Sequence, residues 1–108
     1  MIMIEVSLYT LADGDMVGFR LRGHSGYAES GSDIVCSAVS SAGLMTANTV
    51  TEIMKISAEA QADEGNIMLR IFSKDAACCR DIMQGFRLHM LLLEEQYPDY
   101  IIVKTTEV

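Results

Sequence analysis

A histidine and a cysteine separated by a glycine-bearing loop are the residues of this chain best suited to chemistry. His24 follows a predicted strand and Cys36 enters a predicted helix, with Gly26 and Gly31 between them. An imidazole can take the proton of a thiol, and the thiolate that results can attack a carbonyl carbon. Residues 23–41 therefore hold the minimum equipment for cysteine-based acyl transfer.

Position and neighbours favour Cys36 over the other two cysteines. We expect Cys36 in the first turn of a helix, where unpaired backbone N–H groups and the helix dipole stabilise a thiolate. Cys78 and Cys79 are expected in the first turn of a second helix, but neither has a histidine close in sequence. The alternative is that Cys36 is a small buried hydrophobe, the ordinary role of a free cysteine. On the residues alone both interpretations stay open.

Three residues near the pair each have two interpretations. Asp33 precedes Cys36 by three positions, so it is placed to cap the helix or to orient His24 as the third member of a triad. Ser40, one helical turn after Cys36, either donates a hydrogen bond to the site or lets the helix approach the sheet closely. Tyr27 either covers a bound peptide or packs the loop down.

Residue spacing excludes several other kinds of site. Three cysteines, two of them adjacent, indicate reduced thiols rather than a disulfide framework. No combination of the cysteines with His24 or His89 has the ligand spacing of a zinc site, so no metal is expected. The glycines lack the G-x-G-x-x-G order of a nucleotide loop, and no cofactor is expected. A thiol redox protein is disfavoured because C-x-x-C spacing is absent.

Length and composition predict one globular domain over residues 1–108, because half of the 108 residues are hydrophobic. A net charge of −7 argues against binding to nucleic acid and suits a basic partner. The first residues lack a basic leader, and no stretch approaches the ~18 apolar residues of a membrane span. We therefore expect a cytoplasmic protein that does not bind a membrane.

Hydrophobic periodicity predicts the elements that position the site. In chain order these are strands 2–9 and 16–22, a loop 25–32, a helix from an N-cap at Ser32 or Asp33 to about Lys55, strands 58–62 and 67–71, a helix 74–96 capped by Ser73, and a strand 100–104. The order ββαββαβ predicts an α+β two-layer sandwich. We expect a mixed, mostly antiparallel sheet of four to five strands, built from hairpins 2–22 and 58–71, with two long helices on one face. In strand 58–62 the alanines Ala58, Ala60 and Ala62 are expected to face inward. The residues expected to form the buried stripe of the first helix are Val35, Val39, Ala42, Thr46, Thr49, Val50 and Ile53, with Cys36 at its edge, and those of the second helix are Cys79, Ile82, Phe86, Met90, Leu93 and Tyr97.

Three leucines fall on the polar sides of the predicted helices: Leu44, Leu88 and Leu91. An exposed apolar patch often forms a subunit contact, so these residues point to a homodimer. The alternative is that they are isolated surface leucines, which are common in monomers.

The segment GHSGYAESGSDIVCSAVS, from Gly23 to Ser40, resembles the ribosomal-processing cysteine proteases of the Prp family. The matching positions are Gly23-His24, the glycine-containing loop, Gly31-x-Asp33-Ile34-Val35-Cys36 and Ala38-Val39-Ser40. The resemblance implies a homodimeric cysteine endopeptidase that removes the N-terminal extension of large-subunit ribosomal protein twenty-seven, a basic protein. That extension typically ends in aromatic residues followed by a small residue.

The resemblance also implies a role for each residue of the motif. His24 is the general base and Cys36 the nucleophile, and the supporting residues are Asp33, Ser40 and Gly23. The mobile segment that admits and covers the peptide contains Ser25, Gly26, Tyr27 and Gly31. The alternative function is a non-enzymatic, ribosome-associated binding module in which Cys36 is merely packed.

Overall fold

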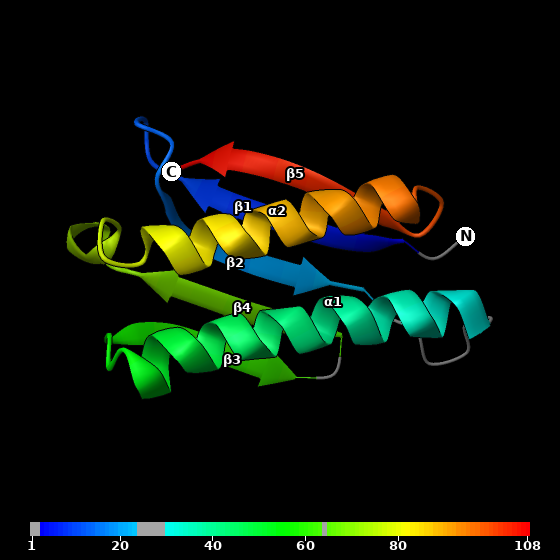
Figure 1. The fold of residues 1–108 in the computed structure, drawn as a ribbon, viewed down its shortest axis with the longest axis horizontal. Helices are drawn as coiled ribbons and strands as arrows, with labels where there is room; N and C mark the ends of the chain where they lie inside the picture. The colour runs from blue at the N-terminus through cyan, green and yellow to red at the C-terminus, as the bar shows by residue number, and fades with distance from the viewer. Residues whose placement is uncertain (1–2, 24–29, 64) are drawn as a thin grey trace.

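A five-stranded sheet carries two helices on one of its faces (Figure 1). The structure, a computed structural model, describes residues 3–23, 30–63 and 65–108, and of residues 30–33 it describes the backbone alone. The strands are β1 (Ile4–Thr10), β2 (Met16–Arg22), β3 (Ala58–Asp63), β4 (Asn66–Ile71) and β5 (Ile101–Glu107), and the two long helices are α1 (Ser30–Asn48) and α2 (Arg80–Gln96). The predicted α+β class and the ββαββαβ order are confirmed.

The two predicted hairpins lie side by side in the sheet. The strand order is β3-β4-β2-β1-β5, and the pairs β1–β2, β2–β4 and β3–β4 are antiparallel. β5 runs parallel to β1, with Ile4 opposite Ile101. The prediction of a mixed, mostly antiparallel sheet is therefore confirmed.

The hydrophobic core lies between the sheet and the helices because alternate strand residues are apolar. Figure 1 shows α2 in front of β1 and β2, and α1 in front of β4 and β3. The rings of Phe19 on β2 and Phe86 on α2 stack with centroids 4.2 Å apart. Gly43 lets α1 approach the sheet, since a Cβ there would lie 2.4 Å from Cδ1 of Leu21.

β3 is less buried than its alanine pattern predicts. Ala58, Ala60 and Ala62 were expected to face inward, but Ala58 is half-buried and the other two are exposed. β3 forms one edge of the sheet, so its small side chains receive cover from one side only. The strand itself, and its pairing with β4, are as predicted.

The first helix begins earlier than predicted. α1 starts at Ser30, so both predicted N-cap residues, Ser32 and Asp33, lie inside the helix and that prediction is wrong. Serine and glycine favour a loop on propensity alone. The helix nevertheless extends through them, ahead of Val35 and Val39, which are fully buried against the sheet. Tertiary packing has here overridden local propensity.

The end of the first helix is π-helical. α1 is followed by a π-helical turn over Thr49–Ile53, in which the N–H of Met54 donates to the carbonyl of Thr49 at 2.8 Å. A π turn is wider than an α turn and rotates the residues in it. Val50 is therefore buried as predicted, while Ile53, also predicted to be buried, is 76% exposed.

Residues Ile34–Ile53 have the length and mean hydropathy, 1.2, of a helix that could cross a membrane, although the sequence was not expected to contain one. In the structure this segment packs on the sheet through a buried stripe that includes Val35, Val39 and Val50. The contact with the core accounts for part of its apolar character, because Ile34, Met45 and Ile53 are exposed.

The second helix begins later than predicted. Ser73 does not cap it, because Ser73–Asp75 is a separate 3-10 turn and α2 starts at Arg80. The buried residues of α2 are Met83, Phe86, Met90 and Leu93. The last three were predicted to be buried, and Met83 was not. Leu88 is exposed as predicted, but Leu91 is half-buried and Leu92 is exposed in its place.

Two side chains of the α2 region fix the helix layer to the sheet. Arg80 donates to both carboxylate oxygens of Asp15, from Nε to Oδ1 at 2.9 Å and from Nη2 to Oδ2 at 2.8 Å. This contact holds the pKa of Asp15 below its usual value. Glu94 Oε2 accepts a hydrogen bond from the backbone N–H of Val103 at 2.7 Å, so α2 covers part of the β5 edge.

Candidate active site

Cys36 lies on α1 beside a cavity at one end of the sheet. Its side chain is half-buried and packs against the core, as predicted for a residue at the margin of the buried stripe. The cavity has a volume of about 350 Å³. Its lining residues come from β1, β2, β3 and β4, from positions next to the ends of these strands, and from α1. They are Ile4, Leu21, Arg22, Gly23, Cys36, Val39, Ser40, Leu44, Ala62, Asp63, Gly65, Asn66 and Ile67.

The structure places Cys36 deeper in its helix than predicted. Because α1 begins at Ser30, Cys36 belongs to the second turn and not to the first. The N–H groups without an intrahelical acceptor are those of the first four helical residues, and the helix dipole acts most strongly within that turn. The prediction that Cys36 itself stands at the positive end of the helix is therefore wrong.

Cys36, Ser40 and Gly23 line the same cavity, although they come from two elements. Cys36 and Ser40 are one turn apart on α1. Gly23 directly follows β2, and its N–H donates to the carbonyl of Gly65 at 3.1 Å. A Cβ on Gly23 would lie 2.9 Å from Cα of Ile4, so a side chain has no room there. This close packing fixes the point from which the chain continues to His24.

Several predicted site residues lie outside the described part of the structure. These are His24, Ser25, Gly26 and Tyr27, together with the side chain of Asp33. Gly31 and Asp33 contribute their backbone to the first turns of α1. The roles assigned to these residues, including the general base, stay predictions.

The apolar walls of the cavity were not predicted from the sequence. Ile4, Leu21 and Ile67, which stand at or next to the ends of three strands, line the cavity together with Cys36, and Leu44 adds to the wall from α1. Their alternation in the strands was the available signal, but it predicts burial and not which strand ends meet. Arg22 and Asp63 are exposed charged residues at the same end.

The other two cysteines have different surroundings. Cys79 is fully buried in the core, as predicted for a residue of the apolar stripe. Burial, and to a smaller extent the neighbouring thiol of Cys78, raises the pKa of the Cys79 thiol to about 11. Cys78 is exposed, and its thiol donates to the carbonyl of Asp75 at 3.2 Å. Both precede α2 and do not lie in its first turn. Among the described residues, no three His, Cys, Asp or Glu side chains gather as a metal site.

Comparison with known proteins gives one family and a set of similar folds. The sequence profile of the family described as cysteine protease Prp matches residues 3–102. SMU.848 from Streptococcus mutans superposes with a TM-score of 0.84 at 25% identity, covering 98% of this chain and 96% of that one. No curated protein sequence matches the chain.

Two crystal structures of the essential ribosomal processing protease Prp from S. aureus have the same fold. The complex with a substrate peptide has a TM-score of 0.85 at 21% identity, and the complex with a covalently linked product peptide has 0.83 at 22%. Each alignment covers 96% of this chain and 100% of the S. aureus chain. At these identities the likeness concerns the fold.

Proposed function

The chain belongs to the cysteine protease Prp family, and from this premise we propose that it cleaves a peptide bond with Cys36 as nucleophile and His24 as general base. The observation that carries the proposal is the half-buried thiol of Cys36 beside a cavity that Gly23, the residue before His24, also lines. Cys78 and Cys79 have no such cavity in the described residues.

The proposed reaction follows ordinary thiol acyl transfer. His24 takes the proton of Cys36, and the thiolate sulfur attacks the carbonyl carbon of the scissile bond. The C–N bond breaks, the amine leaves with the proton from the imidazole, and a thioester on Cys36 remains. Water, deprotonated by the same imidazole, hydrolyses the thioester and restores the thiol.

Stabilisation of the oxyanion is assigned to backbone N–H groups at the start of α1. The first four helical N–H groups lack intrahelical acceptors, and in α1 they belong to residues 30–33. Donors of this kind lower the energy of a tetrahedral intermediate when they are aimed at its oxygen. Ser40, one turn beyond Cys36 in the same cavity, is proposed as a supporting hydrogen-bond donor.

The proposed substrate is the N-terminal extension of large-subunit ribosomal protein twenty-seven. The fold likeness to an S. aureus ribosomal processing protease that binds a substrate peptide supports it. The apolar walls formed by Ile4, Leu21 and Ile67 suit an aromatic side chain near the cleavage point. A net charge of −7 favours association with a basic ribosomal protein. A cytoplasmic location follows from this substrate.

The exposed leucines support a homodimer as part of the same proposal. Leu44, Leu88 and Leu92 are 40%, 58% and 53% exposed on the two helices. Light scattering of the purified chain is expected to give twice the monomer mass. The double variant Leu88→Ser, Leu92→Ser is expected to give a lower mass. A monomeric mass for the unaltered chain at micromolar concentration would contradict the homodimer.

The proposal is tested with a peptide that spans the junction between the extension and the mature ribosomal protein. We expect mass spectrometry to find one cleavage, lost in Cys36→Ser and His24→Ala and retained in Cys78→Ser. Activity that survives Cys36→Ser would exclude the thiol mechanism. Tight binding of the peptide without any product would favour the alternative, a ribosome-associated binding module.

A further inference from the structure

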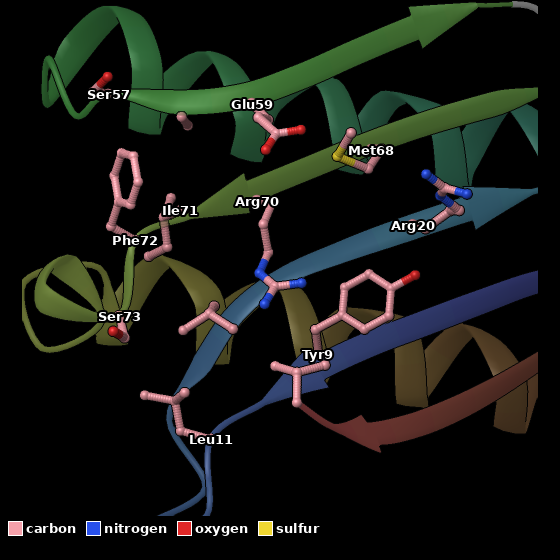
Figure 2. Close-up of a pocket in the computed structure, with 13 residues that line it drawn as sticks. Tyr9, Leu11, Arg20, Ser57, Glu59, Met68, Arg70, Ile71, Phe72 and Ser73 are labelled. Carbon is pink, nitrogen blue, oxygen red and sulfur yellow. The ribbon is translucent and has the colours of Figure 1, made fainter.

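The face of the sheet opposite the helices holds a second cavity, larger than the one beside Cys36. Its volume is about 780 Å³. Figure 2 shows side chains from β1, β2, β3 and β4 standing around it, with Tyr9, Arg20, Met68 and Arg70 among them. No helix covers this face in the described part of the chain (Figure 1). The proposed peptidase reaction uses none of these residues.

Two arginines on adjacent central strands give this cavity its charge. Neither Arg20 on β2 nor Arg70 on β4 forms a salt bridge with a described residue, although the carboxylate of Glu59 lines the same cavity. Nε of Arg20 is buried and has no hydrogen-bond acceptor among the residues that the structure describes. A buried donor without an acceptor is unfavourable, and a bound oxyanion can supply the acceptor.

Arg70 is held in place by its neighbours. Its guanidinium carbon lies 5.7 Å from the centre of the Tyr9 ring, and Figure 2 shows the side chain reaching across β2 toward that ring. Gly18 lies between them in the sheet, opposite Tyr9 on one side and Arg70 on the other. A Cβ on Gly18 would lie 2.3 Å from the carbonyl oxygen of Leu69 and 3.1 Å from Cδ of Arg70, so a side chain has no room there.

The walls of the cavity indicate what the rest of a ligand would contact. Leu11, Met68 and Phe72 line it, and Phe72 is 60% exposed beside it. A ligand that satisfies both features carries an oxyanion on an apolar body. The carboxylate of Glu59 offsets one of the two guanidinium charges, so the remaining positive charge matches a monoanion better than a dianionic phosphate.

We propose that this face of the sheet binds an apolar molecule that carries a single carboxylate, with the carboxylate on Arg20 and Arg70. A carboxylate accepts two parallel hydrogen bonds from one guanidinium, and Nε of Arg20 lacks an acceptor among the described residues. The apolar body lies on Met68 and Phe72.

The probe is 3-phenylpropionate, titrated into the full chain while backbone amide resonances are followed by NMR. We expect shifts for Tyr9, Met68 and Phe72, and none with the neutral 3-phenylpropanamide. Arg20→Met and Arg70→Met are each expected to weaken binding by about tenfold or more. Arg87→Met, which alters an exposed arginine of α2, is the matched control and is expected to leave binding unchanged.

Two further variants separate charge from geometry. Arg20→Lys keeps the charge but removes the Nε donor, so we expect it to bind as weakly as Arg20→Met. Glu59→Gln removes a nearby negative charge and is expected to tighten binding several-fold. Cys36→Ala is expected to bind normally, so that this proposal and the peptidase proposal fail separately.

Several outcomes would overturn the proposal. They are equal binding of the neutral amide, equal weakening by Arg87→Met, and no saturable shift at millimolar probe. Tighter binding of phenyl phosphate than of the carboxylate would assign the site to another class of anion. A change of oligomeric state in the Arg20 or Arg70 variants, without a change in probe affinity, would show that a second copy of the chain covers this face.

Discussion

The N–H of Gly23 donates to the carbonyl of Gly65 at 3.1 Å, which joins the end of β2 to the turn between β3 and β4. Gly23 precedes the proposed general base, and Gly65 lines the cavity beside Cys36. The position from which His24 leaves the sheet thus depends on the neighbouring hairpin. Substitutions at this junction should affect catalysis more than they affect folding.

Gly23→Ala is the first prediction. The added Cβ would meet Cα of Ile4 at 2.9 Å, so the end of β2 must move. We expect kcat/KM for the junction peptide to fall by about ten- to a hundredfold while circular dichroism shows a folded protein. Gly85→Ala is the control, because nothing lies within 4 Å of its added Cβ. Equal activity of the two variants would contradict a fixed junction.

The second prediction concerns the reactivity of the three thiols. Burial raises the pKa of Cys79 to about 11, so this thiol is protonated and inaccessible at pH 8. We expect iodoacetamide at pH 8 to label Cys36 and the exposed Cys78 and to leave Cys79 unmodified, as read by peptide mass spectrometry. A junction peptide is expected to protect Cys36 alone. Equal protection of Cys78 would place the peptide elsewhere.

The ion pair between Arg80 and Asp15 predicts a pH dependence of stability. The pKa of Asp15 is lowered in the folded chain, so the pair contributes stability above the ordinary carboxyl pKa, about 3.9. That contribution is lost as the pH falls through the lower, folded value. In urea unfolding at pH 7, Asp15→Asn is expected to have a lower free energy of unfolding than the unaltered chain. This difference in free energy is expected to disappear near pH 2. A difference in the free energy of unfolding that does not change with pH would contradict this role of the Asp15 carboxylate.

Glu94→Leu is the fourth prediction. It removes the acceptor of the Val103 N–H, and we expect a loss of about 1–3 kcal/mol in the free energy of unfolding. The uncovered β5 edge should also increase aggregation, measured by light scattering on mild heating. Glu95→Leu, at the exposed neighbouring position, is expected to change the free energy of unfolding much less.

Most of the fold could be predicted because strand alternation and helical periodicity record which side chains are buried. Val6 and Leu8 alternate with Glu5, Ser7 and Tyr9, and both are fully buried. Helix boundaries were less predictable, since Ser30 and Ser73 have the same local propensity, yet one starts a long helix and the other a 3-10 turn. Tertiary packing decides between them.

The candidate site could be predicted in part. Cys36 and Ser40 were found by residue type and one-turn spacing, and Gly23 through the family motif. The walls formed by Leu21, Leu44 and Ile67 could not be found, because their contact depends on which strand ends meet. The presence of Arg20 and Arg70 in one cavity on the opposite face depends on strand order in the same way.

The parallel pairing of β1 with β5 has a consequence for the order of folding. It brings Ile4 opposite Ile101, so the sheet closes a loop of nearly the whole chain. Loop closure of this kind costs entropy before any contact is gained and slows folding. During synthesis β1 has no partner on that side until residues 101–107 leave the ribosome. The domain therefore completes its sheet after translation of β5, and a nascent chain that lacks β5 exposes an unpaired strand edge to chaperones and proteases.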